Sequence, residues 1–305
     1  MSTNHPSRYR RRRRIRAIRR VAGLALVVCL AVGGTSLVLH RKQAVPAASA
    51  GSTQSDPAAS SVPEVSSIPE NPDASSAAAV SDTTEGAENG LLTAEQAQAL
   101  LDDPRMVLVN HTHELSDDYA VTTKECGSST ATNKDLQTEA ADAFFAMQAA
   151  AAKDGVDIRM QSGYRNVAYQ TILYNNKVEQ FREKGYSEEE AKKKAASVVN
   201  PPKQSEHVTG LAADLNTPEH PALDEGFADT AAFRWLSQHA VEYGFILRYP
   251  KEAEAVTEIT YEPWHWRYVG PENAALIVQS GLCLEDAVHL LEMLAAGQSI
   301  ESITG

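Results

Sequence analysis

A run of 19 residues without a charged side chain, residues 21–39, follows a strongly basic segment and divides the chain into two unequal parts. About 20 apolar residues are enough to cross the hydrocarbon core of a bilayer as one helix. Nine arginines precede this run, two basic residues follow it, and residues 1–42 contain no acid. By the positive-inside rule, we expect a cytoplasmic tail at residues 1–20, a transmembrane anchor at residues 21–39 and export of the remainder.

Two other interpretations of these segments stay open. A cleaved signal peptide would have a shorter apolar region, of about 7–15 residues, and a small-residue cleavage site. Ala48-Ser49-Ala50 could serve as that site. A nuclear-localisation or RNA-binding arm would explain the arginines but not the apolar run.

Residues 40–90 have the composition of a flexible linker. Ala, Ser and Pro make up 26 of the 48 residues in 43–90, and no aromatic residue occurs there. Such a segment cannot bury enough apolar surface to offset the entropy lost on ordering. We expect a disordered tether that holds the following domain away from the membrane.

Residues 91–305 are interpreted as one domain, because about 200 residues is an ordinary domain size. Residues 43–305 carry 17 basic and 40 acidic side chains. Nucleic acid is therefore not an expected partner, since Lys and Arg are needed to neutralise phosphates. Three cysteines are too few for a disulfide scaffold. Cys126 and Cys283 lie in the exported part, and both a disulfide between them and two buried thiols stay open.

Hydrophobic periodicity and capping signals predict a mixture of helices and short strands in this domain. Helices are expected from the capping box at Thr93 to before Pro104 and over residues 133–153, 166–184, 187–199, 230–243, 271–280 and 284–296. Strands are expected over residues 106–109, 158–162, 211–215, 245–249 and 265–269. The elements lack the regular alternation of a parallel sheet. We therefore predict an α+β fold, a single compact domain with a small antiparallel sheet flanked by helices.

Two segments combine imidazoles and carboxylates in a way that suits a metal. In Ser205-Glu-His207-Val-Thr-Gly-Leu-Ala-Ala-Asp214, a turn glycine can bring the imidazole and the carboxylate together. In Glu262-Pro-Trp-His265, an imidazole follows a carboxylate by three residues. A catalytic zinc takes three protein ligands and keeps one position open for water. Taken singly, each segment also fits a structural role, in a turn or in an aromatic core strand.

A third segment, Gln161-Ser-Gly-Tyr-Arg165, follows a predicted strand and precedes a predicted helix. An arginine at a strand end can bind a carboxylate or polarise a carbonyl oxygen, although a surface arginine is the simpler interpretation. Together the three blocks, SGYR, S-x-H-x-x-G-x-A-x-D and E-P-W-H, resemble the VanY-type family of zinc D-alanyl-D-alanine carboxypeptidases, of the LAS-type metallopeptidases. The resemblance covers roughly residues 91–285.

The resemblance implies a role for each matching residue. The zinc ligands would be His207, Asp214 and His265, holding one Zn²⁺ per domain in a cleft. Glu262 would be the catalytic base that takes a proton from the attacking water. Arg165 would hold the carbonyl oxygen of the substrate and stabilise its developing charge.

Four further residues are assigned less directly. Ser205 matches a serine near the terminal carboxylate of the substrate, and Gln170 matches a substrate-contacting glutamine. His111 departs from the family pattern, which often has Lys at this position. For His111 and His113 we expect structural roles.

The implied activity is removal of the terminal D-Ala from peptidoglycan stem peptides by hydrolysis of the D-Ala-D-Ala bond. The expected location is the bacterial cell membrane, with residues 21–39 as a single-pass anchor and the domain on the extracytoplasmic side. Three alternatives stay open: an L,D-carboxypeptidase acting on tetrapeptide stems, a non-catalytic wall-binding module, and an envelope scaffold. The intact ligand set and Glu262 speak against the last two.

Overall fold

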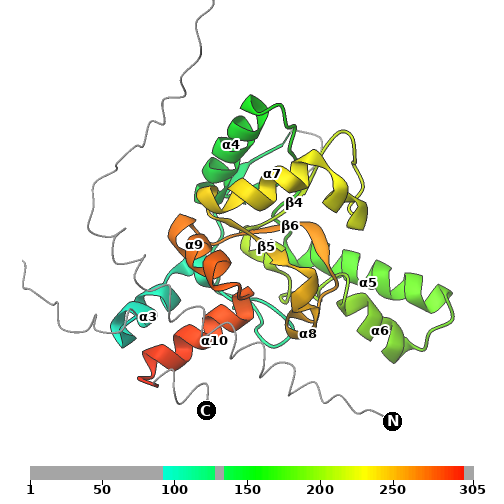
Figure 1. Ribbon diagram of the computed structural model, residues 1–305. Helices are drawn as coiled ribbons and strands as arrows, with labels where there is room; N and C mark the ends of the chain where they lie inside the picture. The colour runs from blue at the N-terminus through cyan, green and yellow to red at the C-terminus, as the bar shows by residue number, and fades with distance from the viewer. Residues whose placement is uncertain (1–91, 128–133, 299–305) are drawn as a thin grey trace, which may run out of the picture.

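A four-stranded antiparallel sheet lies at the centre of the computed structural model, which describes residues 92–127 and 134–298 (Figure 1). The order is β3-β4-β6-β5, with strands β3 (Arg159–Ser162), β4 (Ala212–Asn216), β5 (Phe245–Tyr249) and β6 (Glu262–Tyr268). Two short strands, β1 (Thr123–Glu125) and β2 (Asp135–Gln137), pair separately. The predicted α+β class with a small antiparallel sheet is confirmed. The predicted tail, anchor and linker, residues 1–90, lie outside the described residues.

Helices surround this sheet. The α-helices are α3 (Ala94–Leu101), α4 (Thr138–Lys153), α5 (Val167–Glu183), α6 (Glu188–Ala196), α7 (Ala231–His239), α8 (Glu254–Thr257), α9 (Pro271–Ser280) and α10 (Leu284–Ala295). The 3₁₀ turns are η1 (Pro104–Met106), η2 (Glu206–Thr209), η3 (Glu225–Asp229), η4 (Ala240–Tyr243) and η5 (Lys251–Ala253). The predicted capping box at Thr93 is present, because Thr93 and Gln96 satisfy each other's backbone N–H groups.

One face of the sheet carries the main apolar core. Successive side chains of a strand point to opposite faces, so Ala213 and Leu215 of β4 share a face. These residues join Trp266 of β6 and the buried sides of α4 and α7 in one cluster. Both helices lie over the same side of the sheet in Figure 1. This core fixes the positions of β4 and β6, the two central strands.

The alternate residues of the same strands are polar or charged, yet they are equally buried. Asp214 of β4, His265 and Arg267 of β6 and Arg248 of β5 are at most 4% exposed. A buried charge is costly unless it is paired. Arg248 and Arg267 both pair with Glu206 of η2, whose carboxylate is completely buried. This sheet face is therefore a charged layer within the domain.

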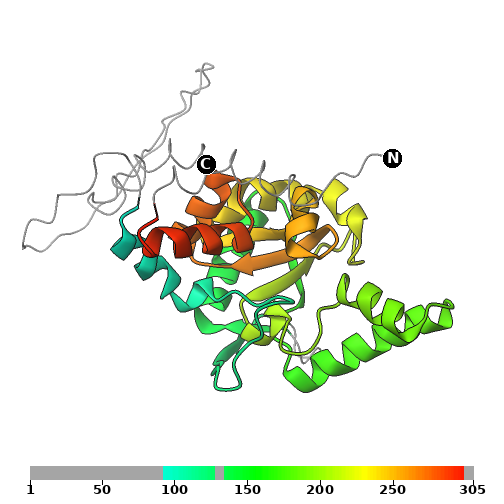
Figure 2. The same ribbon diagram turned by 90° about the horizontal axis from the view of Figure 1, so that it is seen from below.

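A second apolar cluster, formed by α3, α9 and α10, packs against β5 through Ile246. The hairpin of α5 and α6 has its own small cluster around Val178, Ala191 and Ala195. Figure 2 shows this hairpin projecting away from the sheet. In the part of the chain that the structure describes, no single helix has the length and apolar character of a membrane span, and α9 with α10 meets that test only as a pair bent by 98°.

The strand predicted over residues 106–109 is wrong. η1 ends at Met106, and residues 107–109 belong to no strand. Nη2 of Arg267 donates to the carbonyl oxygens of Arg105 and Val107, at 2.9 and 2.8 Å. A side chain thus satisfies backbone acceptors that a neighbouring strand would otherwise bind. Val109 is fully buried, which accounts for the apolar pattern.

The helix predicted over residues 133–153 begins later, at Thr138. Residues 135–137 form β2, and Leu136, expected on the helix face, is buried from this strand instead. Residues 135–137 form a strand and not the start of the helix because they pair with β1. No pattern in the sequence indicated β1. β6 also begins three residues before the predicted start, at Glu262. The other predicted helices and strands are confirmed, with ends that differ by a few residues.

Cys126 and Cys283 are free thiols, and both are buried. Burial raises the pKa of Cys126 to about 11 and that of Cys283 to about 12. Both side chains are therefore protonated at neutral pH and behave as small apolar groups. The alternative of a disulfide is not realised.

The ion pair between Arg248 and Glu285 predicts a pH-dependent contribution to stability. Two hydrogen bonds of 2.8 and 2.6 Å join the side chains. Burial alone would raise the pKa of Glu285, but Arg248 outweighs burial and lowers it. A lowered pKa in the folded state stabilises above the unfolded-state value, about 4.3, and the stabilisation is lost as pH falls through the folded-state value.

We expect Glu285→Gln to reduce the free energy of unfolding at pH 7 by about 3 kcal/mol, because it leaves Arg248 with one buried carboxylate fewer. The difference from wild type should shrink as pH is lowered from 5 to 3. Urea unfolding at a series of pH values measures it. A difference that stays constant over this range would contradict the assignment.

Candidate metal centre

Three side chains from separate segments, His207, Asp214 and His265, meet at one point. Their ligand atoms all lie within 4.8 Å of one another. Nε2 of His207 lies 3.3 Å from Oδ2 of Asp214, and Nδ1 of His265 lies 3.1 Å from Oδ1. Tetrahedral ligands at zinc bond lengths of about 2.1 Å are about 3.4 Å apart. The predicted ligand set is thus assembled with the right spacing.

Strand register and one tight turn bring these residues together. Asp214 and His265 are direct partners across the β4–β6 pairing, so their side chains emerge side by side on the charged face. His207 lies in η2, which ends at Thr209 and is followed by Gly210 with φ of 73°. A side chain at Gly210 would also meet Val121 and the backbone of Gln137. The left-handed turn requires glycine and leads the chain directly into β4.

The surroundings of the three side chains fit a metal ion. Oδ1 of Asp214 is buried and makes no hydrogen bond in the described structure, although it faces His265. An orphaned buried carboxylate oxygen needs a partner, and a cation supplies one. The backbone carbonyl of Gly163 lies 2.7 Å from Nδ1 of His207 and accepts its proton, which leaves Nε2 free as a ligand. Two imidazoles and a carboxylate are a donor set that zinc prefers.

The pKa values of the two histidines move in opposite directions. Burial, with Arg165 nearby, lowers the pKa of His207 to about 4, which keeps this imidazole neutral. Burial also disfavours the charged form of His265, but Asp214 and Glu206 outweigh it and raise the pKa to about 9. Because a ligand atom must be deprotonated, binding of the metal displaces a proton from His265.

Glu262 lies next to the ligands, as predicted. Oε2 of Glu262 is 3.5 Å from Nδ1 of His265. Residues three apart in a regular strand face opposite sides, but the β5–β6 pairing shifts register between Leu247 and Tyr249. This irregularity turns Glu262 toward the same side as His265. Burial raises the pKa of Glu262 to about 8, and Asp214 acts in the same direction.

Arg165 reaches the centre, but with a contact that the sequence did not indicate. Nη2 of Arg165 donates to Oδ2 of Asp214 at 2.6 Å, and Nε donates to Ser162 at 2.9 Å. Nη1 is 3.5 Å from Oε1 of Gln170. One edge of the guanidinium therefore orients a metal ligand, while the group as a whole lines the cavity beside the ligands.

Ser205 and Gln170 also line this cavity. Ser205 occupies the N-cap position of η2, but its hydroxyl does not cap the turn. Gln170 is 1% exposed and donates from Nε2 to the carbonyl oxygen of Asn200 at 2.7 Å. Gln170 thus ties α5 to the segment before η2, and its side chain is largely occupied within the protein.

The cavity has a volume of about 260 Å³, and several residues that line it were not predicted from the sequence. Tyr249 is buried, and its ring lies 4.8 Å from that of His265. Trp264, Asn200 and Lys177 also line it, together with the apolar side chains of Val198, Val199 and Leu223. Tyr249 could have been found from register, because it pairs with Glu262 across β5 and β6. Lys177 is seven residues after Gln170, the spacing of one helix face.

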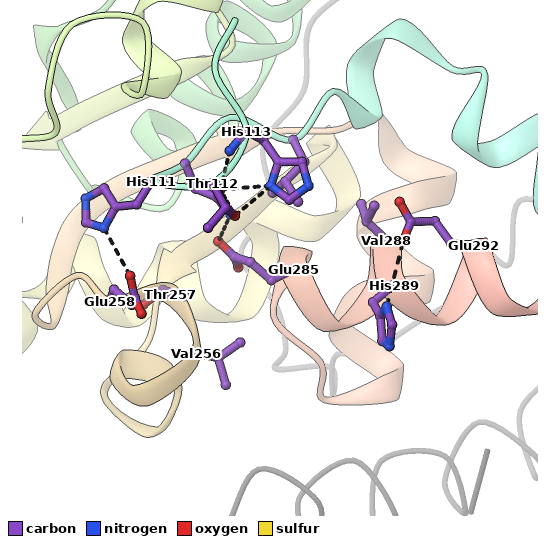
Figure 3. A pocket seen from close by; sticks show the side chains of 12 residues that line it. His111, Thr112, His113, Val256, Thr257, Glu258, Glu285, Val288, His289 and Glu292 are labelled. Atoms are coloured by element: carbon purple, nitrogen blue, oxygen red, sulfur yellow. Dashed lines mark hydrogen bonds and ion pairs between the residues drawn. The ribbon is translucent and has the colours of Figure 1, made fainter. Parts of the chain in front are cut away.

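His111 and His113 lie elsewhere, as expected. They line a second cavity of about 330 Å³ between the segment around residue 110, α8 and α10. Figure 3 shows His111 pointing toward Glu258 and His113 beside Thr112. Neither belongs to the cluster of potential metal ligands.

Residues 133–271, which contain all the residues placed at the centre, match the family model described as VanY, D-alanyl-D-alanine carboxypeptidase. A D-alanyl-D-alanine carboxypeptidase of Enterococcus faecalis (strain ATCC 700802 / V583) is 34% identical over 204 residues, or 66% of this chain and 72% of that protein. The chain belongs to the VanY family. The resemblance of the three sequence blocks is thereby confirmed.

Solved structures similar to this VanY-family chain hold zinc or a dipeptide. A mutant of the vancomycin resistance D,D-pentapeptidase VanY in complex with Zn(II) is 32% identical, with a TM-score of 0.53, covering 60% of this chain and 98% of that one. VanYB in complex with D-alanine-D-alanine is 32% identical, with a TM-score of 0.54, covering 61% and 97%. The expected cofactor, Zn²⁺, is supported by this similarity and by the His207–Asp214–His265 cluster.

Among curated relatives, the Bacillus subtilis (strain 168) protein YodJ, whose name assigns it provisionally to the carboxypeptidases, is 40% identical over 152 residues. The match covers 50% of this chain and 52% of YodJ, so the chain spans about half the length of that relative.

The metal centre predicts a one-to-one zinc content. We expect wild type to bind one Zn²⁺ and His207→Ala and Asp214→Ala to lose it, because two remaining ligands cannot hold the ion against chelation. Elemental analysis after dialysis against a weak chelator measures the content. His113→Ala, a histidine in the second cavity, serves as the matched control and should bind zinc like wild type.

Proposed function

We propose that this protein is a zinc-dependent carboxypeptidase that removes the terminal D-Ala from peptidoglycan stem peptides by hydrolysing the D-Ala-D-Ala bond. The observation that carries the proposal is the position of Glu262, a buried carboxylate 3.5 Å from the ligand atom of His265. A metal cluster with only a structural role does not need a second buried acid beside its ligands on the cavity wall. The E. faecalis relative and the dipeptide complex support the same substrate class.

The mechanism assigns complementary tasks to the metal and to Glu262. When bound, zinc supplies a Lewis acid that lowers the pKa of water and polarises a carbonyl oxygen. Glu262 accepts a proton from the attacking water and transfers it to the departing amine of the terminal D-Ala. Its position next to the ligand His265 places it within reach of both the attacking water and the departing amine.

Arg165 and Ser205 are proposed to orient the substrate. Nη2 of Arg165 is bound to Asp214, and Nη1 stands next to Gln170 on the cavity wall. This position supports hydrogen bonding to the carbonyl oxygen as negative charge develops on it. The hydroxyl of Ser205 is available to the terminal carboxylate because it does not cap η2. Gln170 is proposed to act chiefly by placing Arg165.

An L,D-carboxypeptidase that acts on tetrapeptide stems is the alternative within the same chemistry. It is favoured by one similarity: the L,D-carboxypeptidase LdcB is 33% identical, with a TM-score of 0.53, covering 61% of this chain and 86% of that one. A wall-binding module without activity is disfavoured by the retained Glu262.

The proposed location is the extracytoplasmic side of the bacterial cell membrane. Residues 21–39 would anchor the chain, residues 40–90 would tether the domain, and the arginines before the anchor would stay in the cytoplasm. An enzyme held in this way could reach stem peptides of the wall. Protease accessibility of the domain in intact cells and in lysed cells tests this arrangement.

Product release from two synthetic stems tests the activity. We expect the zinc-loaded protein to release D-Ala from a pentapeptide stem ending in D-Ala-D-Ala and not from the tetrapeptide, with chelation abolishing release. Chiral amino-acid analysis measures the product. Release from the tetrapeptide would move the assignment to the L,D class, and no release from either stem, with zinc bound, would overturn the proposal.

Two substitutions separate the role of Glu262 from that of Arg165. We expect Glu262→Ala to lower kcat about 10²–10⁴-fold with zinc content unchanged, because only the proton acceptor is removed. Arg165→Lys should lower kcat about 10²–10³-fold, since a single ammonium nitrogen cannot reproduce the planar guanidinium, whose separate nitrogens bind Ser162 and Asp214 and face the cavity. Steady-state kinetics with parallel metal analysis measures both. A near-normal kcat for Glu262→Ala would remove this residue from the mechanism.

A further inference from the structure

Glu206 stands between Ser205 and His207 in the sequence, but the proposed mechanism gives it no role. Its side chain is completely buried under the charged face of the sheet. Oε1 lies 2.7 Å from Nε of Arg248 and 2.8 Å from Nη1 of Arg267. Both arginines thus bind the same oxygen, and this arrangement fixes the direction of the other oxygen.

The second oxygen of Glu206 faces the metal centre. Oε2 is buried, makes no hydrogen bond in the described structure and lies 3.9 Å from Nε2 of His265. Nε2 of His265 is likewise buried without a hydrogen-bond partner among the described residues. At 3.9 Å the two atoms are not hydrogen-bonded, but an imidazole nitrogen and a carboxylate oxygen that face each other without other partners are matched as donor and acceptor.

The orientation of the His265 imidazole determines which of its nitrogens faces Glu206. Nδ1 of His265 faces Asp214 and Glu262, so Nε2 points away from these side chains and toward Glu206. A histidine that binds zinc through one nitrogen carries its proton on the other. Donation of that proton to a carboxylate fixes the tautomer and makes the ligating nitrogen more basic.

We propose that Glu206 is a positioning residue for the metal centre: it accepts the Nε2 proton of His265 and so holds Nδ1 toward zinc. The inference rests on the zinc centre of the proposed function. Arg248 and Arg267 stabilise the negative charge of Glu206 and keep Oε1 on their side. Glu206 therefore acts through His265 and does not touch the substrate.

Glu285 extends the same charged network to the other side of the domain and provides a matched control. It binds Arg248 through two hydrogen bonds and lies on the wall of the second cavity, where Asn110 also donates to it (Figure 3). Glu285 thus shares the partner of Glu206, but no described contact joins Glu285 to a metal ligand. Removing the carboxylate of Glu206 or of Glu285 weakens the network, but only the removal at Glu206 affects His265.

The test compares the zinc affinity of Glu206→Gln, Glu206→Asp and Glu285→Gln, measured on the metal-free full chain by competition with a chromophoric chelator. In Glu206→Gln the arginines require the amide oxygen, which turns the NH₂ group toward the proton on His265. Glu206→Asp keeps the charge but draws the carboxylate back by one methylene. We expect zinc binding to weaken about 10–100-fold in both variants. Glu285→Gln should stay within about threefold of wild type, because Glu285 binds Arg248 and no described contact joins it to a metal ligand.

A second measurement covers the case in which a Glu206 variant does not fold. In wild type labelled with ¹⁵N-histidine and loaded with zinc, His265 should show a proton on Nε2 that exchanges slowly with water and no proton on Nδ1. The absence of a proton on Nε2, or unchanged zinc affinity in both Glu206 variants, would overturn the role of Glu206 while leaving the zinc enzyme intact. A wild type that binds no zinc would overturn the metal centre and this inference together.

Discussion

The pairing of Asp214 with His265 across β4 and β6 is the interaction on which the rest of the structure depends. It places a carboxylate and an imidazole side by side on one face of the sheet, with 3.1 Å between the nearest atoms. A shift of one strand by one residue would turn its side chain, Asp214 or His265, into the apolar core and separate the pair. The α4–α7 cluster on the opposite face prevents such a shift, because Ala213 and Trp266 are buried in it. The core thus holds the metal centre in place indirectly.

Burying the charged face of the sheet costs free energy, and the fold offsets this cost by pairing opposite charges. Arg248, Arg267 and Glu206 are removed from water, and each finds an opposite charge. Arg267 additionally binds the backbone of residues 105–107, so the network replaces strand pairing at that edge of the domain. Replacing a buried ion pair with apolar residues often costs little stability. The position of these charges behind His265 gives a functional reason for their presence.

Local irregularities, more than regular structure, determine what faces the cavity. The register shift in the β5–β6 pairing brings Glu262 to the side of His265, and the register shift in β3 places Ser162 opposite Asp214. Ser162 then accepts a hydrogen bond from Arg165, whose other end binds Asp214. Arg165 is therefore both an orienting group for a ligand and part of the cavity wall. Gln170 supports it from α5 and binds the segment before η2.

The sequence by itself determined the family, the candidate ligands and most helices, because these depend on short patterns: three motif blocks, capping residues and helical periodicity. It also identified Glu262 and Arg165 as companions of the ligands. Tertiary structure alone decided the remainder. Residues 106–109 have the pattern of a strand, yet they form none, and the distant Arg267 binds the carbonyl oxygens of Arg105 and Val107. The contacts of Glu206 with Arg248, Arg267 and His265 join residues about 40 to 60 positions apart, and a single sequence contains no local signal for such pairings. Burial in the folded domain strengthens these contacts, because little water competes with them.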